Sequence, residues 1–227
     1  MTRAAAAARQ GTTWRVPLAL VALTAFPLVA GVLRLVEVLG GPAVLPDNPR
    51  VAALPAPLVV HVVSVTVYAV VGAFQMPARL RRSHPVWHRR AGRVAVVAGA
   101  FVALSGLWMT LVYQGAPGGD LLRAVRLVVG SAVAVSIGLG VAAIRRRDVP
   151  SHRAWMIRAY ALAVAAGTQT LTQGAGQALF GTGTLSTALS ISAGWVVNAV
   201  VAEVVVRRPR RTPVRPARSA VRVGATR

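Results

Sequence analysis

Histidine is the residue type in this 227-residue chain best suited to hold a metal or a haem iron, because neutral imidazole is a common ligand for both. The chain has four histidines. His84 and His88 lie in an arginine-rich segment, and His152 follows Ser151, which we expect to be the N-cap of a helix. His61 lies alone in an apolar stretch. His88 and His152 are candidate axial ligands of one haem b if the helices that follow them are neighbours, and His84, His88 and His152 are metal-ligand candidates.

A structural interpretation of the same residues stays open. His84, His88 and His152 are also typical of histidines at a membrane border within basic loops, and His61 is also typical of a hydrogen-bonded core residue. A relay of two haems across a membrane needs two histidines in each half of the bilayer, and only His61 belongs to the second half. The histidines therefore support at most one haem or one metal ion.

A polar stripe surrounds His61 in the sequence. His61, Ser64, Tyr68, Gly72 and Gln75 follow one another at spacings of three, four, four and three, so they share one face of a helix. At 1.5 Å per residue, His61 and Gln75 are about 21 Å apart along the helix axis. We expect this face to point into a helix bundle, with His61, Tyr68 and Gln75 as candidate ligand contacts.

Two later apolar stretches also contain polar and charged residues. Arg158 begins a face that continues to Thr168 and Gln169, and the last apolar stretch contains Asn198 and Glu203. A charge at the centre of a membrane helix costs about 2.5–3.5 kcal/mol. Pairing would offset that cost, so we predict an Arg158–Glu203 ion pair. Together with Arg93, which precedes an apolar stretch, Arg158, Asn198 and Glu203 complete the candidate ligand-binding residues.

Other small and charged residues have simpler interpretations. Gly130, Ala134 and Gly138 recur every four residues and predict close helix packing. Arg34 and Glu37 are three residues apart on one helix, which predicts a local ion pair.

The stretches that position these residues are long and apolar. Hydrophobic residues make up 55% of the chain, the mean hydropathy is +0.60, and charged residues make up 14% against about 25% in soluble proteins. A helix of about 20 apolar residues spans a bilayer core. The sequence thus predicts an all-α, multi-pass membrane bundle (residues 16–206) of six transmembrane helices. The predicted spans are Val16–Val36, Leu58–Pro77, Val94–Val112, Leu121–Ile144, Ala154–Gly174 and Ala188–Val206.

The arginines predict the orientation of these spans. All 26 basic residues are Arg, against 5 acidic residues. Three arginines precede the first span, six lie between the second and third, four between the fourth and fifth, and eight follow the last. Only Arg34, Arg50, Arg123 and Arg126 belong to the other side. Because basic loops stay in the cytoplasm, we expect both termini there and the chain in the cell membrane.

The two ends of the chain have their own compositions. Residues 1–15 form a basic N-terminal segment, and the stretch beginning at Val16 is too long for the apolar core of a signal peptide, so we expect it to be retained. Residues 207–227 alternate Arg with Pro, Ala and Val, which predicts a disordered tail attracted to anionic lipid headgroups. We expect no nucleic-acid partner, because the arginines flank membrane spans. The absence of Cys excludes thiolate chemistry.

Three segments together resemble a known family. The first is the loop His84-Pro85-Val86-Trp87-His88-Arg89-Arg90-Ala91-Gly92-Arg93, the second is Ser151–Leu162 (SHRAWMIRAYAL), and the third is Trp195–Glu203 (WVVNAVVAE). With His61 and Phe74-Gln75 upstream, they resemble the bacterial multi-pass membrane proteins catalogued as domain-of-unknown-function family 2306, over about Leu58–Glu203. This chain departs from the family pattern at Gln169 and Gln173, where an Arg often follows a Thr-rich stretch. The resemblance implies a membrane topology and no established activity.

Three functions fit these observations. The first is binding of a haem, a metal or a small molecule between helices near the cytoplasmic face, which allows a redox role. The second is transport of a small molecule or of protons along the polar stripes. The third is a non-catalytic accessory or assembly role, in which the stripes hold the helices together. Hydrolysis is disfavoured, because the sequence contains no Ser/His/Asp arrangement, phosphate-binding glycine loop or paired carboxylates.

Overall fold

The chain folds entirely into helices over the part that the structure describes. The structure, a computed structural model, describes residues 3–208, with side chains from residue 14 onward, so most of the predicted tail lies outside the described residues. No strand occurs within this range, which confirms the all-α prediction. Its helices are α1 (Arg3–Val38), α2 (Pro49–Ala53), α3 (Ala56–Gln75), α4 (Ala78–Ser83), α5 (Pro85–Val112), α6 (Gly119–Arg145), α7 (Val149–Ala163), α8 (Ala166–Phe180) and α9 (Thr184–Arg207).

Five helices are long and apolar enough to cross a membrane. They are α3, α5, α6, α9 and the Trp14–Val38 part of α1, and they correspond to five of the six predicted spans. The prediction of one continuous helix over Ala154–Gly174 is wrong. That stretch is divided at Val164 and Ala165 into α7 and α8, each of 15 residues. Whether α7 and α8 together form a sixth span stays a prediction.

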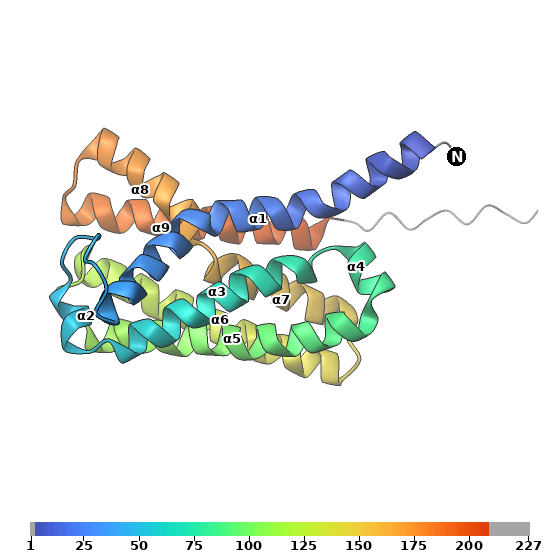
Figure 1. The fold of residues 1–227 in the computed structure, drawn as a ribbon, viewed down its shortest axis with the longest axis horizontal. Helices are drawn as coiled ribbons and strands as arrows, with labels where there is room; N and C mark the ends of the chain where they lie inside the picture. Colours follow the sequence, from blue (N-terminus) through green and yellow to red (C-terminus); the bar gives the residue numbers. More distant parts are fainter. Residues whose placement is uncertain (1–2, 209–227) are drawn as a thin grey trace, which may run out of the picture.

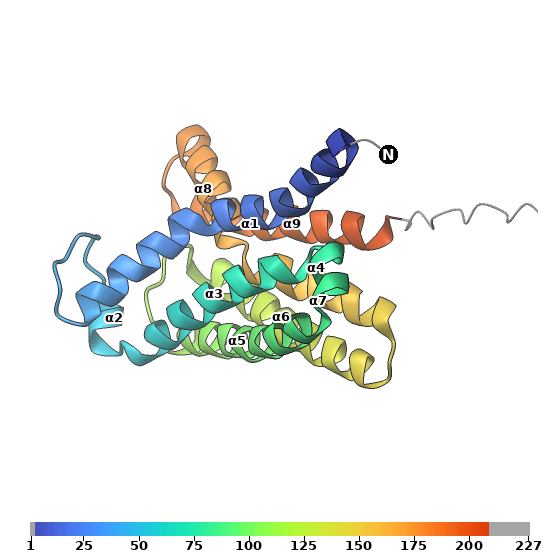
Figure 2. The same ribbon diagram turned by 45° about the vertical axis from the view of Figure 1, so that its right-hand side comes forward.

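The connections rich in arginine lie at one end of the bundle. The start of α1, the short helix α4, the connection from α6 to α7 and the end of α9 are together at the right-hand end of Figure 1. The connections around α2, from α5 to α6 and from α8 to α9 lie at the opposite end (Figures 1 and 2). This arrangement separates the two groups of arginines as the sequence predicted, and the assignment of the arginine-rich end to the cytoplasm stays a prediction.

The α3–α5 pair is packed through glycines. Three glycines of α5 recur every seven residues, and each lies opposite a polar residue of the α3 stripe. A Cβ atom on Gly99 would stand 2.7 Å from the Tyr68 ring, closer than real Cβ contacts come. We call these pairs the glycine seam. They are Gly92 with Gln75 (3.4 Å), Gly99 with Tyr68 (2.7 Å) and Gly106 with His61 (3.5 Å), measured from a Cβ built on each glycine.

The main apolar core lies where α3, α5 and α7 meet. The rings of Tyr68 and Tyr160 are 5.6 Å apart, and the Tyr160 hydroxyl donates a hydrogen bond to the Ala69 carbonyl at 2.7 Å. The polar stripe of α3 therefore faces the bundle interior, as predicted, at Tyr68 and at Gly72, which packs against the Tyr160 ring. The buried members of the apolar core are Tyr68, Ala69, Ala73, Ala95, Ala98, Val102, Tyr160 and Val164.

A second close approach joins α8 to α1. Pro27 lies inside α1 and has no N–H, so the Leu23 carbonyl lacks the helical donor four residues later. The first turn of α8 comes against this carbonyl at Gly167, where any Cβ would overlap the Leu23 oxygen. Only glycine fits at this position, because the neighbour is backbone and cannot rotate away.

The small-residue prediction for α6 is half confirmed. A Cβ on Gly130 would stand 2.8 Å from Leu107 of α5, which is a close approach. Nothing lies within 4 Å of the corresponding position on Gly138.

The Arg34–Glu37 ion pair is present at 2.7 Å, and Arg34 also donates to the Pro46 carbonyl at 2.6 Å.

Candidate functional site

His88 and His152 lie near each other at the arginine-rich end of the bundle. His88 is in the first turns of α5, His152 is in the first turn of α7, and these helices are in contact. His152 and the guanidinium groups of Arg81 and Arg89 lie within electrostatic range of the His88 ring. The neighbouring helices that a shared ligand would need are therefore present.

The ring of His152 is held in a defined orientation. Its Nδ1 is 2.8 Å from the Gly140 carbonyl of α6, which accepts a hydrogen bond and so requires a proton on Nδ1. In the neutral ring, the lone pair is then on Nε2. An Nδ1–H bonded to a carbonyl is the usual arrangement of a histidine that binds metal through Nε2.

The helix that carries His152 begins earlier than predicted. Asp148, not Ser151, is the N-cap of α7, and its carboxylate accepts a hydrogen bond from the Ser151 N–H at 3.1 Å. Hydrogen bonds from Ser151 lower the pKa of the Asp148 carboxyl below its ordinary value. Both residues are good capping types, and Pro150 is accepted in the first helical turn, so the helix starts at the first candidate.

Two buried nitrogen atoms at this end have no hydrogen-bond partner among the described residues. They are Nδ1 of His88 and Nε2 of Gln75, whose amide lies against Gly92, one helical turn after His88. Buried polar atoms are nearly always paired in native proteins, so these two nitrogen atoms are available to a water molecule or a ligand. Gln75, His88 and His152 form what we call the cytoplasmic-end site, named for its predicted side.

The other two histidines do not join this site. His84 is exposed, and its Nδ1 pairs with the neighbouring Ser83 hydroxyl at 2.8 Å. His61 is near the opposite end of α3, and its Nδ1 is 3.0 Å from the Ser105 hydroxyl oxygen. Among the described residues, no group of three or more His, Asp or Glu side chains lies close enough to hold a metal ion.

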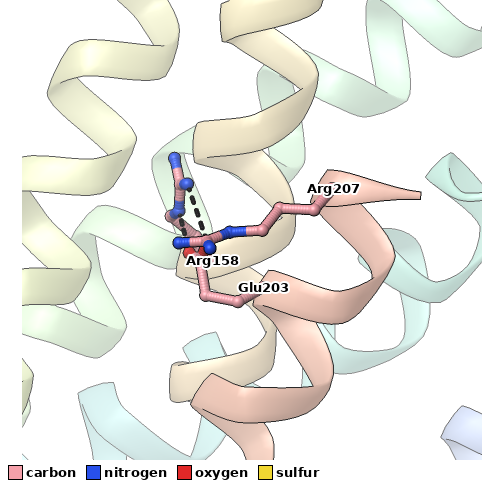
Figure 3. A network of polar contacts seen from close by, with 3 residues as sticks. All are labelled: Arg158, Glu203 and Arg207. Carbon is pink, nitrogen blue, oxygen red and sulfur yellow. Dashed lines mark hydrogen bonds and ion pairs between the residues drawn. The ribbon is translucent and has the colours of Figure 1, made fainter. Parts of the chain in front are cut away.

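Arg158 and Glu203 form the predicted ion pair between α7 and α9. Nε of Arg158 is 2.6 Å from Oε1 of Glu203, and Nη2 is 3.2 Å from Oε2, which makes a two-pronged contact. Arg207, one turn further along α9, also reaches Glu203 at 3.3 Å (Figure 3). The Arg158 guanidinium lies 4.8 Å from the centre of the Trp155 ring. One carboxylate thus holds two guanidinium groups at the arginine-rich end.

Asn198 joins the two halves of the divided fifth stretch. Its side-chain Nδ2 donates to the Ala161 carbonyl of α7 at 2.7 Å, and its Oδ1 accepts from the Thr168 hydroxyl of α8 at 2.8 Å. In a continuous helix the Ala161 carbonyl would bind the Ala165 N–H, which here binds Leu162 instead. A side chain inserted into the helical ladder is a known cause of a break. We call Ala161, Thr168 and Asn198 the Asn198 corner.

Gln169 and Arg93 occupy two further places. Nε2 of Gln169 is buried beside the Asn198 corner without a hydrogen-bond partner among the described residues, and its side chain packs against Gly194 of α9. Arg93 is exposed and lines a surface groove between α3 and α5. The candidate residues therefore separate into four places: the glycine seam, the cytoplasmic-end site, the ion pair with the Asn198 corner, and the groove.

Comparison with known proteins supports the membrane assignment. No curated protein and no solved structure matches this chain. A family model described as predicted membrane protein (DUF2306) matches residues 58–206, which contain α4 through α8 and nearly all of α3 and α9. Helix α1 lies outside the match, whereas α8, which it contacts, lies inside it. Because the match covers most of the chain, this protein belongs to the DUF2306 family of predicted membrane proteins.

Proposed function

We propose that this protein binds one haem b at the cytoplasmic-end site, in the cell membrane, with both termini in the cytoplasm. The observation that carries the proposal is the position of His88 and His152, within electrostatic range of each other at the starts of the contacting helices α5 and α7. His152 is oriented through the Gly140 carbonyl, with Nε2 left for a ligand. His88 contributes a buried, unpaired Nδ1. Haem iron bound by protein nitrogens carries out one-electron transfer.

The residues around the two histidines suit the rest of the group. A haem has two propionate carboxylates, which bind arginine side chains through charge-assisted hydrogen bonds. Arg81 and Arg89 are near enough to act electrostatically on His88. The unpaired Nε2 of Gln75 is a further hydrogen-bond donor at the same end. A single site at one face suits acceptance of electrons at that face and not their passage across the membrane.

The test is the visible absorption spectrum of the detergent-purified full chain from cells supplied with a haem precursor. We expect a Soret band, and after reduction the sharp bands of iron with two imidazole ligands. His88→Ala and His152→Ala should each lose the group, and added imidazole should restore part of it. His84→Ala and His61→Ala are matched controls that should keep it. A wild-type protein without haem, or retention in both His88→Ala and His152→Ala, would overturn the proposal.

A second candidate function rests on the divided fifth stretch. Helix ends at mid-membrane depth line the substrate sites of many transporters. Here the ends of α7 and α8 meet at the Asn198 corner, with the unpaired Nε2 of Gln169 beside it. Proton or small-molecule movement along this path would be expected to use Gln169 and the nearby Arg158–Glu203 pair.

Proton flux into vesicles separates the two functions. The purified chain is placed in vesicles containing a pH-sensitive dye, and a membrane potential is imposed. Transport predicts flux above that of empty vesicles, lowered by Gln169→Leu and Glu203→Gln and unaffected by His88→Ala. Flux equal to that of empty vesicles counts against a proton pathway and leaves the haem proposal standing.

A further inference from the structure

We infer that the groove between α3 and α5 binds one anionic phospholipid, with an acyl chain along the groove and the phosphate on Arg93. This inference is independent of the proposed haem site. The groove has a volume of about 440 Å³, and it is shallow and mostly open. Its walls are formed by Val63, Ser64 and Val67 of α3 and by Arg93, Val97 and Phe101 of α5.

The groove has the size and polarity of an acyl-chain site. Apart from Arg93 and the Ser64 hydroxyl, every side chain that lines it is apolar. Val97 and Phe101 are about half exposed although they lie in the middle of a membrane-spanning helix. Apolar surface on such a helix faces lipid tails, and a concave strip of it holds one tail more firmly than a flat strip.

Arg93 gives the groove one charged end. It precedes Phe101 by eight residues, so the groove runs about 12 Å along α5, close to half of a bilayer core of about 30 Å. No hydrogen bond or ion pair joins the Arg93 guanidinium to another residue that the structure describes. Arg93 is the ninth residue of α5, and α5 begins at the end where the arginine-rich connections gather (Figure 1).

Charge complementarity selects the occupant. Basic pockets between membrane helices bind anionic headgroups, and the guanidinium fork matches the phosphate oxygens. A lipid whose phosphate rests on Arg93 places its tail directly into the apolar part of the groove. A zwitterionic lipid would bring a positive headgroup to the same arginine-rich end, so an anionic one is favoured.

The experiment is native mass spectrometry of the detergent-purified full chain titrated with phosphatidylglycerol, with phosphatidylcholine or with inorganic phosphate. Arg93→Gln should weaken binding of the first phosphatidylglycerol about fivefold, which corresponds to one arginine near a membrane surface. Arg90→Gln is the matched control, because it removes the same charge from the same helix outside the groove, and it should change the affinity by less than half as much.

The tail part of the site has its own test. Ser64→Phe fills the groove from α3, and Val97→Trp fills it from the exposed wall of α5, so a folding defect in one does not decide the outcome. Both should weaken phosphatidylglycerol binding, and neither inorganic phosphate nor phosphatidylcholine should match phosphatidylglycerol. Equal losses from Arg93→Gln and Arg90→Gln, unchanged binding in both filled variants, or equal binding of phosphatidylcholine would each overturn the inference.

Discussion

The glycine seam and the Asn198 corner hold polar side chains inside the bundle by different means. At the seam, α5 presents glycines, and the larger side chains of α3 rest on its backbone. At the corner, the polar groups of α7, α8 and α9 bond directly to one another. The middle of the seam, at Gly99 and Tyr68, thus depends on shape, and the corner depends on hydrogen-bond geometry. At the His61 end of the seam, a hydrogen bond with Ser105 adds to the packing.

This difference affects how each region tolerates change. The seam has no room for an added group at Gly99, and overpacking a well-packed site costs about 1–3 kcal/mol. Hydrogen bonds between membrane helices contribute about 0.6 kcal/mol each on average. We therefore expect the seam to fail abruptly and the corner to weaken gradually.

The largest effect is expected from Gly99→Leu. The new side chain would meet the Tyr68 ring and Ile137, both within 3 Å of the first added carbon. We expect the free energy of unfolding to fall by about 3 kcal/mol, measured by titrating SDS into dodecylmaltoside micelles. Gly138→Leu is the control, because open space surrounds Gly138, and it should keep the wild-type stability. Equal losses in the two variants would contradict packing by glycine at the seam.

A smaller loss is expected from Gly167→Ala. The added methyl overlaps the Leu23 carbonyl, so α8 must move away from α1, at a cost of about 2 kcal/mol. Gly174→Ala on the same helix meets nothing within 4 Å and should be neutral or slightly stabilising, since alanine favours helix. The same SDS titration measures both. Equal stability of the two variants would show that α8 does not depend on its approach to α1.

The sequence predicted the features whose cause is local or electrostatic. The Arg158–Glu203 pair was predictable because each charge lies in an apolar stretch and needs a partner. The polar face of α3 follows from its spacing. The seven-residue spacing of Gly92, Gly99 and Gly106 was a visible signal for the seam, and it matches the spacing of His61, Tyr68 and Gln75.

The break between α7 and α8 could not be predicted in the same way. No proline marks it, and Val164 and Ala165 are ordinary residues inside an apolar run. Its cause is the Asn198 amide, which is more than thirty residues away in the chain and takes the Ala161 carbonyl. The closeness of His88 and His152 likewise depends on the packing of α5 against α7. From the sequence, this packing could only be stated as a condition for a shared ligand.

Asn198→Leu tests the corner with a moderate effect. The change removes two hydrogen bonds between helices, so the free energy of unfolding should fall by about 1 kcal/mol. Thr168→Val removes one of the two and should cost about half as much. Thr170→Val is the control, because that hydroxyl bonds only to Ala166 of its own helix. A loss in Asn198→Leu as large as in Gly99→Leu would remove the proposed contrast between the two regions.

The Arg158–Glu203 pair should contribute less. About a third of each side chain is exposed, so solvent screens the attraction, and such pairs contribute about 0.2–1 kcal/mol. A double-mutant cycle with Arg158→Gln and Glu203→Gln should give a coupling free energy in this range that decreases with added salt. Because Arg207 also binds Glu203, the cycle is repeated with Arg207→Gln. A coupling unaffected by salt would contradict a solvent-screened pair.

The smallest expected effect concerns pH and the start of α7. Hydrogen bonds from Ser151 lower the pKa of the folded Asp148 carboxyl, so its stabilisation is complete above the unfolded pKa of about 3.9 and is lost as the pH falls through the lower folded value. Asp148→Asn should therefore be less stable than the wild type at pH 7, with the gap closing towards pH 2. Ser151→Ala, which keeps the backbone donor, should give an intermediate slope in the same unfolding measurement. A constant gap across this pH range would show that Asp148 acts on α7 only as a polar residue and not through its charge.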